Sequence, residues 1–328
     1  MNLDGKLLVK AKTKLEEKKQ QHERLFEQRR SEAFAKSPRV YELDSLQRSL
    51  MIELVAAALG SGDISVDDIR QKSKKLYEEK KDELVKAGFR ADYIDEVYLC
   101  EKCSDTGYEN SKICSCLMDL YKDEQRKELS NLLKLGDETF DSFNITYYSD
   151  KPSTDTNISP RQSMEVVFET CKEYANKFNK KSNNLLFIGA PGLGKTFLSA
   201  CIARVVADSG YSVAYDMAAS IFARFEDAKF SRTDDLEEIR DEIKRYLECD
   251  LLIIDDLGTE MTTSFTISAL YEIINTRLIN NRKTLINTNL IIDEMRRRYT
   301  KQIMSRLEGE YLILTFFGDD IRRIKNAY

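Results

Sequence analysis

The chain has 328 residues, of which 42% are hydrophobic and 33% are charged, and this length allows two domains, each with its own core. The formal net charge of −5 argues against general coating of nucleic acid, and the single histidine excludes catalytic triads and metal sites that need histidine, unless His22 itself serves. No apolar run approaches a membrane span and the N-terminus lacks the apolar block of a secretory signal, so we expect a cytoplasmic protein.

The first ninety or so residues predict helices. Residues 1–36 carry more basic than acidic side chains and few apolar ones, which favours a long exposed helix that faces either solvent alone or a partner protein or DNA. We expect His22 to be exposed on this helix. Residues 43–59 are far more apolar and predict a buried helix that ends at Gly60. Residues 67–86 predict another charged helix, which Gly88 stops.

A cluster of cysteines follows, with the spacing of a metal knuckle. Its members are Cys100, Cys103, Cys114 and Cys116. Four thiolates on two short turns can close a tetrahedral zinc site, which leaves no open position for chemistry and would help the N-terminal domain to fold. Free thiols are the alternative, and another ligand could replace one cysteine of the less common C-x-C pair. The remaining cysteines lie singly on apolar faces, where we expect core positions: Cys171, Cys201 and Cys249.

Residues 117–135 predict a helix, and residues 137–159 read as an interdomain linker because they are rich in turn-forming residues. The front half of this linker is aromatic, with Phe140, Phe143, Tyr147 and Tyr148. We expect these rings to dock the linker onto the next domain, near the base of any nucleotide that binds there.

A buried strand then leads into LLFIGAPGLGKT, which is the pattern of a phosphate-binding loop followed by a helix. The glycines let backbone N–H groups point at phosphate oxygens, and the N-terminus of the helix attracts the same negative charge. Lys195 would reach the β- and γ-phosphates, and Thr196 would bind Mg²⁺. The predicted nucleotide-binding residues are Gly189, Ala190, Pro191, Gly192, Leu193, Gly194, Lys195, Thr196 and Phe197.

From about residue 160 helices alternate with continuous apolar strands, which predicts an α/β domain with a five-stranded parallel sheet covered on both faces. The strand LLIIDD would place Asp255 at the carboxyl edge of the sheet to hold Mg²⁺, and Asp256 would orient or deprotonate water. Asn289 ends the next strand and would act as a polar sensor of that water. Arg306 and Arg322 are candidates to neutralise charge at the γ-phosphate, although either could be an idle surface arginine.

Together, GAPGLGKT, LLIIDDLGTE, the NTN after the fourth strand, SRLEGEY and DDIRR resemble the successive motifs of the AAA+ ATPases of the bacterial helicase-loader group, the DnaC and DnaI type, and their transposition relatives, the IstB type. The cysteine cluster followed by DTG resembles the zinc-containing helicase-binding domain of DnaI-type loaders. The resemblance implies that Arg306 reaches into the ATP site of the neighbouring subunit and that Arg322 is the second sensor of its own subunit.

The family further implies a DnaB-type replicative helicase and single-stranded DNA as partners, with self-association through the ATPase domain. In this chain Asp256 replaces the usual glutamate and the helical lid is absent or vestigial, so we expect a low-turnover switch. The predicted division is a helical zinc-binding domain at 1–136, a linker at 137–159 and an AAA+ domain at 160–328. A basic cluster would contact DNA phosphates or be an idle solvated face; it comprises Arg296, Arg297, Arg298 and Lys301.

The leading function is ATP-dependent helicase loading, and its closest rival is a transposition helper of the IstB type, which shares the ATPase motifs but is not expected to carry the cysteine cluster. A P-loop kinase would need an acceptor pocket and a mobile lid, which the sequence does not supply. A non-catalytic adapter that uses zinc and ATP only as structural supports is the third alternative.

Overall fold

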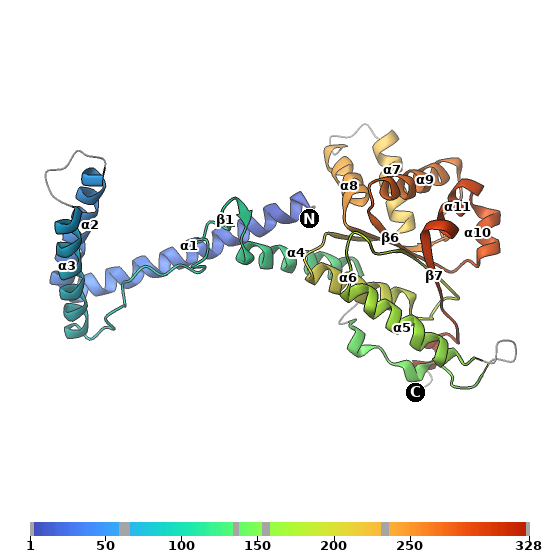
Figure 1. The fold of residues 1–328 in the computed structure, drawn as a ribbon, viewed down its shortest axis with the longest axis horizontal. Helices are drawn as coiled ribbons and strands as arrows, with labels where there is room; N and C mark the ends of the chain where they lie inside the picture. Colours follow the sequence, from blue (N-terminus) through green and yellow to red (C-terminus); the bar gives the residue numbers. More distant parts are fainter. Residues whose placement is uncertain (1–2, 59–65, 134–137, 153–157, 231–235, 326–328) are drawn as a thin grey trace. The chain divides into compact units, whose positions relative to one another are not determined.

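The computed structural model describes residues 3–58, 66–133, 138–152, 158–230 and 236–325 (Figure 1). The chain divides into two compact units, which are described separately: Lys12–Leu117, and Met1–Ala11 together with Met118–Tyr328. Within the described ranges, no helix is both long and apolar enough to cross a membrane.

The first unit is built from three helices and a small hairpin. The helices are α1 (Gly5–Lys36), α2 (Pro38–Ala58) and α3 (Val66–Lys86), and the hairpin pairs β1 (Tyr108–Glu109) with β2 (Lys112–Ile113). Four buried side chains form a small core; they are Ala33, Val40, Leu84 and Ile94. Gly88 adopts a φ of 83°, which ends the third helix as predicted.

Two expectations for this unit are wrong. The α2 helix is not buried, because Leu46, Met51 and Ile52 are 50%, 55% and 73% exposed, while Leu43 is fully buried. The apolar residues of α2 lie on more than one side of the helix, and among the described residues the side that carries Leu43 is the buried one. His22 is partly buried on α1 rather than exposed. The predicted end of α2 at Gly60 lies outside the described residues.

The second unit contains the predicted parallel sheet of five strands, in the order β4-β5-β6-β3-β7. The strands are β3 (Asn184–Ile188), β4 (Val213–Met217), β5 (Leu251–Leu257), β6 (Lys283–Thr288) and β7 (Tyr311–Thr315). The predicted α/β fold is therefore confirmed. Side chains alternate between two cores, so that Leu185 and Phe187 face one side of the sheet and Leu186 and Ile188 the other.

Helices cover both faces of this sheet (Figure 1). One face packs against α5 (Pro160–Asn176) and α6 (Lys195–Asp208). The other face packs against α7 (Ala218–Phe230), α8 (Leu236–Glu248), α9 (Ser264–Ile279), α10 (Ile292–Arg298) and α11 (Lys301–Glu310). The short helix α12 (Ile321–Lys325) follows the last strand. Cys171, Cys201 and Cys249 are all buried in these two cores, as predicted.

The compact units do not divide where the sequence places its domain boundary. Most of the helix α4 (Ser115–Leu133) belongs to the second unit, and Gln125 Nε2 donates to the Tyr211 carbonyl oxygen, just before β4, at 2.8 Å. Arg245 of α8 pairs with Glu128 at 2.6 Å and with Asp4 at 3.1 Å. These polar contacts hold α4 and the first residues of the chain within the second unit. The domain boundary at residue 136 stays a prediction.

The aromatic half of the predicted linker docks onto the core of the second unit, as expected. Its two short 3-10 helices are Phe140–Ser142 and Ile145–Tyr147. Phe140 and Tyr148 are 9% and 1% exposed and belong to the core cluster that α5 and α6 cover. This docking leaves the linker beside the loop that joins β3 to α6. Residues 137 and 153–157 lie outside the described part.

Candidate nucleotide site and cysteine cluster

The phosphate-binding loop joins β3 to α6, and its backbone needs glycine at two positions. Gly192 and Gly194 adopt φ values of 81° and 89°, in the left-handed region that favours glycine. A Cβ atom on Gly192 would lie 1.9 Å from Asp320 Oδ1, and the Ile321 N–H donates to the Gly192 carbonyl oxygen at 3.0 Å. The C-terminal segment therefore closes against the outside of the loop, and the N-terminus of α6 stays available to an anion.

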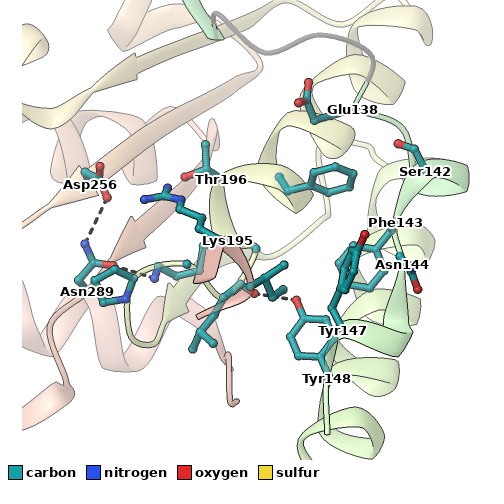
Figure 2. A pocket seen from close by; sticks show the side chains of 17 residues that line it. Glu138, Ser142, Phe143, Asn144, Tyr147, Tyr148, Lys195, Thr196, Asp256 and Asn289 are labelled. Atoms are coloured by element: carbon teal, nitrogen blue, oxygen red, sulfur yellow. Dashed lines mark hydrogen bonds between the residues drawn. The ribbon is translucent and has the colours of Figure 1, made fainter. Parts of the chain in front are cut away.

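Lys195 is buried at the base of the loop and is held by three acceptors. Its Nζ donates to the carbonyl oxygens of Gly189 and Ala190 at 2.6 and 2.8 Å, and to Asn289 Oδ1 at 2.8 Å (Figure 2). Burial lowers the pKa of Lys195 to about 8, against the opposing charges of Asp256 and Asp255. Phosphate oxygens that enter the loop would compete with these acceptors for the ammonium group.

Asp255 and Asp256 are consecutive residues of β5, and the strand becomes irregular at Asp256. The pairing of β5 with β6 shifts between Ile254 and Leu257, and Asp256 has a φ of 53°. A bulge of this kind re-aims side chains that a regular strand would send to opposite faces. Asp255 stays on the face of the sheet that carries Ile253, and its Oδ1 lies 3.3 Å from Thr196 Oγ1. The bulge turns Asp256, whose Oδ1 accepts from Asn289 Nδ2 at 3.3 Å. Burial and the Asp255 charge raise the pKa of Asp256.

A cavity of about 340 Å³ opens over the loop, a size suited to a small-molecule ligand. Figure 2 shows Asp256 and Asn289 on one side of Lys195, and Phe143, Tyr147 and Tyr148 on the other. The cavity therefore has a polar end, suited to phosphates and a cation, and an aromatic end, suited to a flat base. The predicted residues that line it are Pro191, Gly192, Leu193, Gly194, Lys195, Thr196, Phe197, Asp256, Asn289 and Arg322.

The two candidate arginines stand in different places. Arg322 lines the cavity, beside Ile321 of α12. Arg306 does not line it, because it is held on α11 by side chains of α9. Its Nη2 donates to Asn275 Oδ1 at 2.7 Å and to the Tyr271 hydroxyl at 3.1 Å, and its guanidinium lies 4.7 Å from the centre of the Tyr271 ring. Within one chain, only Arg322 is brought to the nucleotide site.

No sequence motif points to the hydroxyl of Tyr148, which donates to the Leu193 carbonyl oxygen at 2.8 Å. Tyr148→Phe is expected to lower the affinity for ATP about fivefold, because losing a hydrogen bond to a buried carbonyl costs about 1 kcal/mol and loosens the loop. Titration with a fluorescent ATP analogue measures the effect. The control is Tyr174→Phe, whose buried hydroxyl finds no hydrogen-bond partner among the described residues and should leave the affinity unchanged. Equal affinities in all three proteins would contradict the prediction.

Part of the basic cluster is neutralised by carboxylates within the domain. Arg296 pairs with Glu308 at 2.8 Å and with Asp293 at 3.1 Å. Arg298 donates to the backbone oxygen of Glu260, which is a buried residue. The cluster therefore presents less positive charge than its sequence suggests.

The four predicted metal ligands come together in the first unit. All four Sγ atoms lie within 4.8 Å of one another, with Cys100 and Cys114 3.8 Å apart and Cys103 and Cys116 3.5 Å apart. A tetrahedral site with Zn–S bonds of about 2.3 Å has S–S edges of roughly 3.8 Å, so the arrangement fits zinc. Both cysteines of the C-x-C pair take part, so no other ligand is needed there. The Cys116 backbone N–H lowers the pKa of Cys114 to about 7, which favours a thiolate.

The loops that carry the cysteines are held in unusual conformations by a few polar contacts. The carboxylate of Asp105, at a φ of 61°, accepts from the backbone N–H groups of Leu99 and Cys100 at 3.0 and 2.7 Å. The Gly107 N–H donates to Cys103 Sγ at 3.3 Å, as donors around a metal-bound thiolate do. The sequence did not predict the β1–β2 hairpin, which brings the second pair of cysteines back to the first.

Comparison with known proteins finds matches to the C-terminal half of the chain. Residues 167–308 match the family model described as IstB-like ATP binding protein. The chain is 28% identical over 153 residues to the replicative helicase loader DnaC of Buchnera aphidicola subsp. Baizongia pistaciae, and 26% identical over 152 residues to that of Escherichia coli K12. Each match covers 46% of this chain and 61% of the relative, so the chain spans less than two thirds of the relatives' length.

Among solved structures, the DnaC helicase loader superposes with a TM-score of 0.45 and 20% identity, covering 58% of this chain and 98% of that one. The family model and the sequence relatives confirm the resemblance that the motifs indicated. The second half of the chain is thus similar, in sequence and in the order of its motifs, to the IstB-like ATP binding proteins and to the DnaC-type helicase loaders.

Proposed function

We propose that this protein loads a DnaB-type replicative helicase onto single-stranded DNA at the start of replication, using ATP as a switch. The observation that carries the proposal is that one cavity is lined by Lys195, Asp256, Asn289 and Arg322 together. The domain that holds this cavity is similar in sequence to that of relatives named as helicase loaders. The cavity also has an aromatic end that suits an adenine base.

In the proposed hydrolysis, Lys195 binds the β- and γ-phosphates and Arg322 neutralises charge from within the same subunit. The oxygen ligands Thr196 and Asp255 would hold Mg²⁺, and their separation of 3.3 Å suits this hard cation. When bound, Mg²⁺ neutralises charge on the phosphates. Asp256 orients or deprotonates the attacking water, which Asn289 helps to position. Asp256 is one methylene shorter than the glutamate usual here, so we propose a low turnover.

We propose that Arg306 acts on the ATP of a neighbouring subunit, because Arg306 does not line the cavity of its own subunit. Its place on the α11 helix, with a guanidinium that is only partly buried, supports this role. Mixing Arg306→Ala with Lys195→Ala protein is expected to restore turnover, since a mixed interface pairs one intact loop with one intact arginine. If the mixture stayed inactive and ATP never changed the particle's mass, the proposed assembly would be wrong.

We assign helicase binding to the N-terminal domain, proposed as residues 1–136 with a structural zinc on the four cysteines. The linker (137–159) and the AAA+ domain (160–328) complete the proposed division. The cysteine geometry supports zinc, and the closed tetrahedron leaves no site for catalysis. Such a site supplies folding free energy to the unit that carries the cysteines.

A transposition helper of the IstB type is the second candidate, because the matching family model carries that description. The cysteine cluster favours the loader, since that N-terminal domain is not expected in the transposition helper. A kinase or a non-catalytic adapter has no such observation in its favour.

Co-purification with the replicative helicase of the same cell, with and without ATP, tests the proposal. We expect a complex with the helicase whose yield depends on ATP, and transfer of the helicase to single-stranded DNA at moderate salt. Binding to a transposase with no helicase complex would replace the loader by the transposition helper. An ATPase rate equally low in wild type, Lys195→Ala and Asp256→Asn would favour the adapter.

A further inference from the structure

The carboxylate of Asp255 is enclosed by hydrogen-bond donors on both of its oxygens. Oδ1 accepts from Thr196 Oγ1 at 3.3 Å, from Asn287 Nδ2 at 2.8 Å and from the Asp256 N–H at 3.0 Å. Oδ2 accepts from the Tyr215 hydroxyl at 2.6 Å. Asp255 is only 6% exposed, so water does not supply the same contacts freely. Each oxygen therefore has a fixed set of protein partners.

Tyr215 reaches this carboxylate from the neighbouring strand. β4 and β5 are parallel and pair Tyr215 with Ile253, so Tyr215 and Asp255 are diagonal neighbours on the same face of the sheet. Tyr215 is 5% exposed, and it belongs to the core cluster that α6 covers. Nothing in the motifs around the phosphate loop points to this tyrosine, because it lies on a different strand.

The same contacts extend to the helix that follows the phosphate loop. Asn287 of β6 donates to Ser199 Oγ at 2.9 Å, and Ser199 in turn donates to the Thr196 carbonyl oxygen at 3.0 Å. The Ser199 and Tyr215 hydroxyls are 3.3 Å apart. Side chains from β4, β6 and the start of α6 are thus joined around Asp255 of β5. This buried network fixes Asp255 relative to Thr196.

We propose that Tyr215 is a positioning residue for Mg²⁺, which holds Oδ2 of Asp255 so that Oδ1 faces Thr196. The inference rests on the proposed ATP site. The carboxylate plane of an aspartate turns easily about its last torsion, because that torsion has broad minima. The hydrogen bond from the Tyr215 hydroxyl holds Oδ2, the oxygen that does not bond to Thr196, and so restricts this rotation. Loss of the hydroxyl leaves the carboxylate oriented only by the donors to Oδ1, so Oδ1 is held less firmly at the position that the metal needs.

Tyr215→Phe tests the inference, since it removes one oxygen and keeps the ring in the core. Binding of a fluorescent ATP analogue is measured against Mg²⁺ concentration, with an EDTA baseline. We expect the Mg²⁺ concentration that gives half of the metal-dependent gain to rise about tenfold, because hydrogen bonds to charged groups are strong. Affinity in EDTA should stay that of wild type.

The matched control is Tyr246→Phe. Tyr246 is also a buried tyrosine of this domain, and its hydroxyl donates to the carboxylate of Asp216 at 2.7 Å, away from the cavity lining. This variant should lower the thermal midpoint to a similar extent and leave the Mg²⁺ requirement unchanged. A purely structural role for Tyr215 predicts the same behaviour for both variants.

An unchanged Mg²⁺ requirement in Tyr215→Phe, or an equal loss of affinity with and without the metal, would overturn the inference. If that variant is too unstable to measure, Asn287→Ser removes the amide donor to Oδ1 and is expected to shift the Mg²⁺ requirement in the same direction; no shift overturns the inference. Wild-type protein that fails to bind the analogue at any Mg²⁺ concentration would instead reject the proposed ATP site itself.

Discussion

Lys195→Ala is expected to lower the affinity for ATP about a hundredfold. The ammonium group is buried at the base of the loop, and hydrogen bonds to charged groups are worth about 1.5–3 kcal/mol. Isothermal titration with ATP and Mg²⁺ measures the loss. The hydrolysis rate should fall further, because the transferred phosphoryl group relies on the same charge.

The control for this change is Lys177→Ala. Lys177 is an exposed lysine of the same domain, and its ion pair with Glu173 at 2.6 Å is a surface pair of small energetic value. It changes the net charge by the same amount and should leave ATP binding as in wild type. An unchanged affinity in Lys195→Ala would show that the loop does not hold phosphates as proposed.

Cys103→Ser is expected to abolish zinc binding and to unfold the loops around the cysteines. Three thiolates do not close the tetrahedron, and structural zinc contributes about 10–16 kcal/mol of binding free energy in small peptides. Metal analysis should find one zinc per chain in wild type and almost none in the variant. The Gly107 and Cys114 N–H groups, which donate to Cys103 Sγ and to the Gly107 carbonyl oxygen, should lose protection from hydrogen exchange.

Cys201→Ala is the matched control, because it removes a buried thiol from a helix of the ATPase core and leaves the cluster intact. It should retain full zinc content and normal exchange at Gly107. Wild-type protein that carries no zinc, yet protects the same amides, would show that the cysteines are free thiols and that hydrogen bonds alone hold the loops.

Several features follow from chemistry that is local in the chain. The phosphate loop depends on glycines, a lysine and a threonine within eight positions, and in the structure the glycines lie between β3 and α6 while Lys195 and Thr196 begin α6. The parallel sheet follows from continuous apolar strands that alternate with helices. The close approach of the four cysteines follows from two short spacings that bring thiols to one centre.

Other features depend on residues that are far apart in the sequence. The bulge at Asp256 turns this carboxylate into the cavity, although strand alternation by itself would send it to the face opposite Asp255. The exposure of Leu46, Met51 and Ile52 on α2 could not be read from an apolar pattern, because a pattern does not say whether another element covers it.

By itself, the sequence determined the fold class, the phosphate loop, the cysteine cluster and the acidic strand end, since each arises from residue types at short, fixed spacings. Only the tertiary structure decided that Tyr148 supports the loop, that Tyr215 holds Asp255 and that Arg306 stays outside the cavity of its own chain. The physical reason is that a hydrogen bond between segments dozens of residues apart depends on how strands and helices pack, and short spacings carry no record of that packing.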